Sequence, residues 1–190
     1  IQQQPRYPFA FICSDALTYA EMYGHDFDVI HASPPCQLFS AATRTAPSQS
    51  AHPDLIPATR HVLFRSGTPF VIENVSGAPL KQAIQLCGSS FGLDLRRHRL
   101  FDSSVALLGL HCAHEWQTPR FPPNRGNRRK HGTTLASVIS VAGHDTRGAT
   151  GVLEWSRAMG IDWMTRDELA QAIPPVYTEF IGRQILSVIL

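Results

Sequence analysis

The chain has 190 residues, of which 43% are hydrophobic and 17% charged, and its formal net charge at pH 7 is +2. This composition predicts one hydrophobic core with at most a small second lobe. No run approaches the roughly 18 apolar residues of a membrane helix, and we expect no secretion signal, so we expect neither a membrane-spanning nor a secreted protein. The four cysteines lack the regular spacing of a disulfide scaffold, so we expect a cytoplasmic protein.

Strands and helices alternate in the first half of the chain. The expected strands cover residues 9–13, 27–31 and 70–72, and the expected helices cover 16–23 and 54–64. Because the two kinds of element alternate, we predict an α/β fold with a doubly wound, mostly parallel sheet.

Residues 102–150 interrupt this alternation with several prolines and glycines, and we interpret them as an inserted lobe. The predicted domains are therefore a core over 1–101, the lobe over 102–150 and a return to the core over 151–190. In the last part, Thr165 and Glu168 have the spacing of a capping box, and a helical apolar pattern runs to Leu190.

The strand over 27–31 leads into a proline-stiffened loop that carries one cysteine, Cys36. Pro34 and Pro35 fix two φ angles, so the thiol should leave the carboxyl edge of the sheet in a defined direction. Open α/β folds bind their ligands at this edge. The alternative is a buried structural cysteine, since free cysteine behaves as a small hydrophobe.

Two further segments supply charged groups. The strand over 70–72 is followed by Glu73, which we expect beside Cys36. A predicted strand over 96–101 puts Arg97 and Arg99 on one face, because side chains alternate along a strand. A thiol, a carboxylate and two guanidiniums together indicate a site for an anionic substrate.

Four short blocks, in this order and spacing, resemble those of the DNA cytosine-5 methyltransferases, most of all the small, phage-type members with short recognition regions. The blocks are Pro35-Cys36-Gln37, Glu73-Asn74-Val75, Leu95-Arg96-Arg97-His98-Arg99 and Gln171-Ala172-Ile173-Pro174-Pro175. Leu95 replaces a glutamine of the family pattern, and Gln171 replaces an asparagine. Neither change removes an atom that does the chemistry.

The resemblance implies the fold of S-adenosylmethionine-dependent methyltransferases and transfer of a methyl group to C5 of a cytosine in double-stranded DNA. Cys36 would add to C6 of the flipped-out base. Glu73 would hold N3 and the exocyclic amine, and Arg97 or Arg99 would bind the target phosphate or the base carbonyl.

The resemblance also places the residues around these groups. Asp15, Pro35 and Gln171 would lie at the cofactor, S-adenosylmethionine. Gln37 and Ser40 would shape the loop around the flipped base. The lobe over 102–150 would recognise the target sequence.

Between Trp116 and His144 there is no acidic residue, and the stretch is rich in arginine. We expect it to face DNA phosphates, because such a patch supplies sequence-independent affinity; a solvated loop is the alternative. The basic residues are Arg120, Arg125, Arg128, Arg129 and Lys130.

His111-Cys112-Ala113-His114 has enough ligand-type side chains to begin a zinc site. No second pair at structural spacing is obvious, and Cys87 or His131 would have to be supplied from elsewhere in the fold. We therefore predict no metal site.

The glycine-rich turn and the acidic residue with which the family binds its cofactor are not found in this chain. Residues 1–9 resemble the stretch that follows the family's second strand. We therefore expect a missing amino-terminal segment, through truncation or a split gene with a partner chain. Two alternatives to the methyltransferase remain: a non-catalytic DNA-binding remnant, and a transferase for RNA cytosine or for another one-carbon group.

Overall fold

The computed structural model describes residues 3–40, 51–119, 136–139, 141 and 151–190. The chain forms two compact units: Ile1–Gln85, Arg99–Gly109 and Ile181–Leu190 make up the first, and Leu86–His98 and Leu110–Phe180 make up the second. The units divide the chain at other points than the three predicted domains, because residues 99–109 and the end of the chain return to the first unit.

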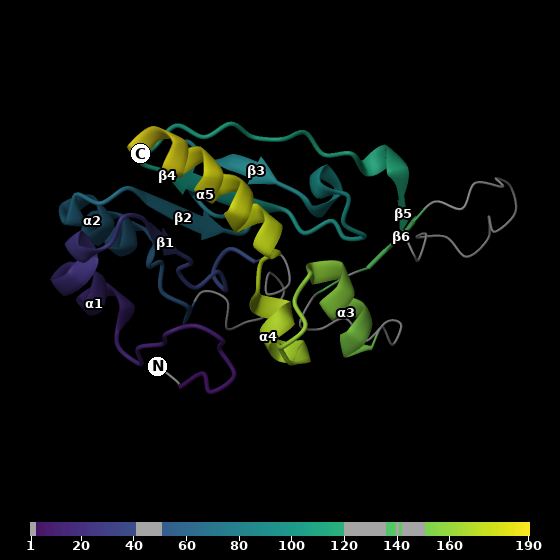
Figure 1. Ribbon diagram of the computed structural model, residues 1–190, viewed down its shortest axis with the longest axis horizontal. Coiled ribbons are helices and arrows are strands. Elements are labelled where there is room, and N and C mark those ends of the chain that lie inside the picture. The colour runs from purple at the N-terminus through teal and green to yellow at the C-terminus, as the bar shows by residue number, and fades with distance from the viewer. Residues whose placement is uncertain (1–2, 41–50, 120–135, 140, 142–150) are drawn as a thin grey trace, which may run out of the picture. The chain divides into compact units, whose positions relative to one another are not determined.

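A four-stranded sheet is the framework of the first unit (Figure 1). Its order is β1 (Ile30–Ala32), β2 (Phe70–Asn74), β4 (Arg99–Ser103) and β3 (Ile84–Leu86). β1 pairs with β2 in parallel, whereas β2 pairs with β4 antiparallel.

The α/β class is as predicted, but the prediction of parallel pairing is wrong for β2 and β4. A parallel pair needs a long crossover connection, which is usually a helix. Between β2 and β4 the chain forms only β3 and a short 3₁₀ turn. It has no crossover helix there to carry it back to the edge of the sheet at which β2 begins.

The two predicted helices of the first half form as α1 (Ala16–Tyr23) and α2 (Ile56–Ser66). The carboxylate of Asp15 accepts the Thr18 N–H at 2.9 Å, which caps the start of α1. α2 ends at Gly67, whose φ of 73° is in the left-handed region that favours glycine. Local signals at the helix ends therefore predict both elements well.

All five residues of β2 are buried. Leu63 of α2 packs against Phe70 and Ile72 on one face of this strand. Because side chains alternate along a strand, Glu73 points to the opposite face. β2 is thus an interior strand of the sheet, with an apolar face toward α2 and a carboxylate on the other face.

The predicted strand over residues 9–13 does not form. Phe9 is 71% exposed and Ile12 is 59% exposed. A strand persists only where a neighbour takes up its backbone hydrogen bonds, and no strand of the described chain pairs with this segment. The prediction of a buried strand here is wrong.

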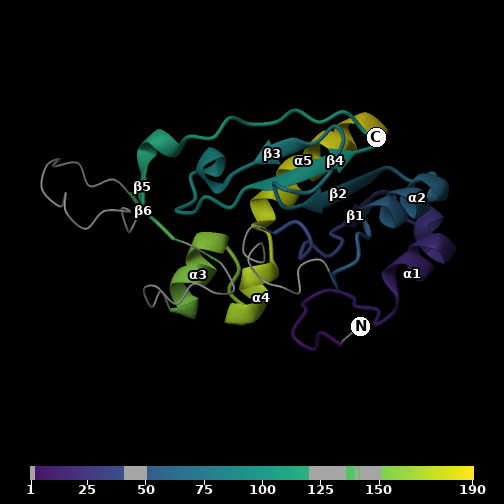
Figure 2. The ribbon, with the colours of Figure 1, turned by 180° about the vertical axis from the view of Figure 1, so that it is seen from behind.

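The predicted final helix forms as α5 (Pro175–Ile189). Its apolar pattern buries Tyr177, Ile181 and Ile185, whereas Val188 is 65% exposed. In both views the C-terminal half of α5 crosses the sheet of the first unit (Figures 1 and 2). Within the described ranges, no helix combines the length and the apolar character needed to span a bilayer.

The second unit contains β5 (Gln117–Pro119), β6 (Ala136–Val138), α3 (Val152–Met159) and α4 (Arg166–Gln171). The capping box at Thr165 and Glu168 is confirmed, because the Thr165 N–H donates to the Glu168 carboxylate at 2.7 Å. The core of this unit consists of Leu95, Val141, Trp155, Ala158, Met159, Ile161 and Leu169.

Candidate active site

The loop after β1 carries Cys36, and the neighbouring strand anchors it. Asn74, the last residue of β2, donates a hydrogen bond from Nδ2 to the Pro34 carbonyl at 3.0 Å. Asn74 is only 1% exposed, and its Oδ1 accepts the Val75 N–H at 2.9 Å, so the amide is bonded at both ends. The Pro34-Pro35 dipeptide therefore starts from a fixed point just before the cysteine.

A second contact anchors the far side of the same loop. The chain turns after Cys36, and the Phe39 N–H donates to the Cys36 carbonyl at 3.0 Å. A Cβ at Gly77 would lie only 2.7 Å from the Phe39 carbonyl oxygen, so glycine is needed where the two backbones meet. Cys36 itself is half-buried and is a free thiol.

An ion pair joins β2 and β4 in the same unit. Arg99 Nε lies 2.9 Å from Glu73 Oε1, and the two side chains are 16% and 9% exposed. Glu73 is opposite Phe101 in the ladder, so Arg99 is its diagonal neighbour on the same face. β1 and β2 are parallel, so Cys36 after β1 and Glu73 near the end of β2 belong to one edge of the sheet.

Arg97 does not share a strand face with Arg99, because β4 begins at Arg99 and Arg97 lies in the irregular segment before it. That prediction is wrong. Within the second unit, the Arg97 guanidinium donates to the carbonyls of Val141 at 2.7 Å and Ala170 at 2.6 Å. The Tyr177 hydroxyl donates to the Arg97 carbonyl at 2.7 Å. These bonds favour a structural role for Arg97.

The residues predicted at the cofactor, S-adenosylmethionine, are divided between the two units. The Asp15 carboxylate is bonded to the Thr18 N–H as a helix cap, which lowers the pKa of this exposed group. Pro35 is exposed in the first unit, and Gln171 is exposed at the end of α4 in the second. Their role at the cofactor stays a prediction.

The residues predicted at the DNA lie partly outside the described ranges. Gln37 is exposed and Ser40 is half-buried, and both belong to the turn region after Cys36. The predicted phosphate contacts lie outside the described residues, and they are Arg120, Arg125, Arg128, Arg129 and Lys130.

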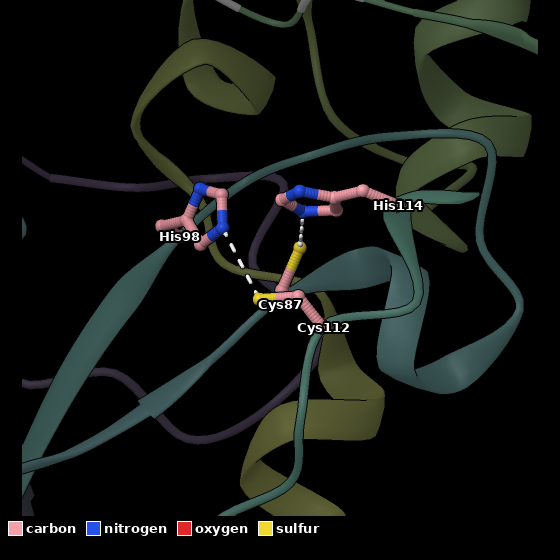
Figure 3. A group of neighbouring side chains, drawn as sticks. All are labelled: Cys87, His98, Cys112 and His114. Atoms are coloured by element: carbon pink, nitrogen blue, oxygen red, sulfur yellow. Dashed lines mark hydrogen bonds between the residues drawn. The ribbon is translucent and has the colours of Figure 1, made fainter. Parts of the chain in front are cut away.

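Four side chains of the kind that binds metal ions lie together in the second unit, although the sequence predicts no metal site. Cys87, His98, Cys112 and His114 each offer one ligand atom, and these atoms all lie within 4.8 Å of one another (Figure 3). Sequence analysis singled out Cys112 and His114. It named Cys87 only as a ligand that would have to come from elsewhere in the fold, and it missed His98, because both stand in separate segments without the short spacing of a zinc finger.

No family model matches this chain, and neither does any curated protein. The first unit presents a half-buried thiol on an anchored loop, and a carboxylate paired with a guanidinium on the adjacent strands. Such a set can add a nucleophile to an electron-poor ring and hold the charge that results.

Replacing Asn74 with alanine should leave the buried Pro34 carbonyl without its donor. Such a loss costs about 1–3 kcal/mol, so the free energy of unfolding in urea should fall by that amount. The loosened loop should also let Cys36 react faster with iodoacetamide, measured by mass spectrometry with Cys13 as internal reference. Gln82→Ala removes an exposed amide and should change neither quantity. An unchanged Cys36 rate in Asn74→Ala would contradict the anchoring role.

Replacing Gly77 with alanine should push the Cys36 loop away from the turn after β2, because the new methyl group would overlap the Phe39 carbonyl. Hydrogen exchange should then speed up in peptides covering residues 34–40. Gly182→Ala is the matched control: its Cβ meets nothing within 4 Å, and alanine stabilises a helix by about 0.5–1 kcal/mol over glycine. Equal protection of the loop in both variants would show that the close approach is unimportant.

Proposed function

We propose that this chain carries the catalytic thiol of a DNA cytosine-5 methyltransferase, with S-adenosylmethionine as the methyl donor. The observation that carries the proposal is the anchoring of the Cys36 loop by Asn74 and Gly77, which flank the end of the strand that bears Glu73. The resemblance joins a Pro-Cys-Gln block and a Glu-Asn-Val block far apart in the sequence. The bond from Asn74 of the second block to Pro34, the residue just before the first block, supports reading the two blocks as one site.

The chemistry follows from the ring. C5 of cytosine is a poor nucleophile, but addition of the Cys36 thiolate to C6 forms an S–C bond and moves the C5–C6 π pair onto C5. C5 then takes an electrophile. Loss of the C5 proton and expulsion of the thiolate restore the aromatic ring, so sulfur is regenerated in each cycle.

Glu73 and Arg99 would hold the charge that arises when sulfur adds. In this proposal Glu73 contacts N3 and the exocyclic amine, and Arg99 contacts the base carbonyl or the target phosphate. A nearly buried carboxylate needs a counter-charge, and the 2.9 Å pair with Arg99 supplies it and orients both groups in advance. The base must leave the stack to reach this edge.

A second candidate is a protein that binds DNA without turnover. One observation favours it: the Asp15 carboxylate, predicted at the cofactor, is bonded to the Thr18 N–H as a helix cap. The two candidates differ in whether Cys36 adds to cytosine, so the decisive test should need no methyl donor.

Exchange of the C5 hydrogen provides that test. With no donor present, addition of Cys36 lets C5 take a solvent proton and lose its original one, so duplex DNA tritiated at cytosine C5 should release tritium to water. Cys36→Ser should reduce the release to background, because an alcohol is a far weaker nucleophile than a thiolate. Cys13→Ser, at an exposed cysteine, should behave as the unchanged chain.

If Cys36→Ser releases tritium as fast as the unchanged chain does, Cys36 is not the nucleophile. No release by the unchanged chain, together with retained DNA binding, would favour the non-catalytic candidate. Release from single-stranded RNA but not from duplex DNA would move the proposal to an RNA cytosine transferase.

The arginine-rich stretch between Trp116 and His144 should contribute affinity for DNA without selecting a base sequence. Replacing Arg128 and Arg129 with alanine should weaken binding to all duplexes alike. The slope of log K against log salt should become shallower by up to about 1.8, because each phosphate that the protein neutralises adds about 0.9 to its magnitude. The control Arg65→Ala/Lys81→Ala removes the same charge from exposed positions of the first unit. Weaker binding to one DNA sequence alone would show that these arginines contact bases and select the sequence.

A further inference from the structure

Two cysteines and two histidines from separate segments of the second unit converge on one point (Figure 3). Cys87 is fully buried and precedes the 3₁₀ turn Gly88–Phe91. His98 ends the segment before β4, and Cys112 and His114 lie where the chain enters the 3₁₀ turn His114–Trp116. The Cys87 Sγ is 3.2 Å from His114 Nε2, and the Cys112 Sγ is 3.4 Å from His98 Nε2.

These separations suit the edges of a tetrahedral zinc site. Zn–S bonds of about 2.3 Å and Zn–N bonds of about 2.0–2.1 Å place a sulfur and a nitrogen ligand about 3.5 Å apart. The two observed S···N distances differ from this by a few tenths of an ångström. An ion therefore fits among the four atoms with only small movements of the side chains.

Surrounding groups are arranged as outer partners of a metal site. Ser89 Oγ lies 3.1 Å from the Cys87 Sγ and accepts the Ala113 N–H at 3.1 Å, so its own hydrogen is suited to donate to a thiolate. The Arg96 guanidinium donates to the His114 carbonyl at 3.1 Å and holds that ligand's backbone. Such partners orient the ligands of a metal, and their hydrogen bonds reduce the negative charge on thiolate sulfurs.

The backbone also brings the ligand segments together independently of any metal. A Cβ at Gly88 would clash with the Leu95 carbonyl, so the turn beside Cys87 lies directly against the segment that leads to His98. The His98 and His114 rings meet edge to face at 79°, with centroids 5.1 Å apart. This arrangement turns each Nε2 toward a different sulfur (Figure 3).

We propose that Cys87, His98, Cys112 and His114 bind one Zn²⁺ in a closed, structural Cys₂His₂ site. Binding releases the protons of the two thiols, and the two thiolates then balance the charge of the ion. All four positions are supplied by the protein, which is the pattern of structural zinc rather than catalytic zinc. The ion would join the segment ending at His98 to the segment beginning at Leu110. None of these ligands belongs to the proposed active site, so the site can be tested independently.

The 190-residue chain, purified without chelators, should contain one zinc ion per molecule by plasma mass spectrometry. After replacement of zinc by Co²⁺, it should show the intense d–d absorption of tetrahedral cobalt and a thiolate-to-cobalt charge-transfer band. Cys112→Ser should lose zinc and both spectral features, whereas Cys13→Ser, at an exposed cysteine, should keep them. If Cys112→Ser does not fold, alkylation of the unchanged chain replaces it: Cys112 should be protected with zinc bound and reactive after chelation.

Three results would overturn the proposal. The first is a purified chain without zinc that gives no tetrahedral cobalt spectrum on titration. The second is full zinc occupancy in Cys112→Ser, or a Cys112 that reacts equally before and after chelation. The third is a disulfide between Cys87 and Cys112, seen as a decrease of two hydrogens in the intact mass without reductant.

Discussion

The hydrogen bond from Asn74 to the Pro34 carbonyl is the contact on which the candidate active site depends. It is buried, it joins the end of β2 to the loop after β1, and it acts on a segment already stiffened by two prolines. Removing a buried donor leaves its acceptor unsatisfied, at a cost of about 1–3 kcal/mol. The cysteine loop is therefore held by the same strand that bears the carboxylate, so the positions of thiol and carboxylate are set together.

The two candidate sites belong to separate compact units and use different chemistry. In the first unit, Glu73 and Arg99 form a nearly buried ion pair on the sheet, where their low exposure strengthens their mutual attraction and limits their freedom to turn. In the second unit, sulfur and imidazole side chains converge without a carboxylate among them. Arg97 and Arg99 illustrate the division: two residues apart in sequence, one bonds backbone carbonyls of the second unit and the other bonds Glu73.

Sequence reasoning succeeded where the signal was local. Gly67 ends α2, the Thr165–Glu168 box opens α4, and the apolar run beginning at Phe70 is a strand. It failed where the outcome depends on distant partners. Residues 9–13 have a strand-like composition but no neighbour to pair with, and the direction of β4 depends on its connection rather than on its residues. The convergence of Cys87 and His98 on Cys112 and His114 has no short-range signature at all, since it arises from the packing of turns such as the one at Gly88.

The most direct test of the central claim identifies the residue that bonds to cytosine. Duplex DNA with 5-fluorocytosine at its cytosines would be incubated with the chain and S-adenosylmethionine, denatured, digested and mapped by tandem mass spectrometry. Once C5 has taken the methyl group, it carries fluorine in place of the proton that would leave, so the thiolate is not expelled and the adduct at C6 persists. We expect the modified nucleotide on Cys36. An adduct on Cys13 or on another residue would contradict the account of the anchored thiol.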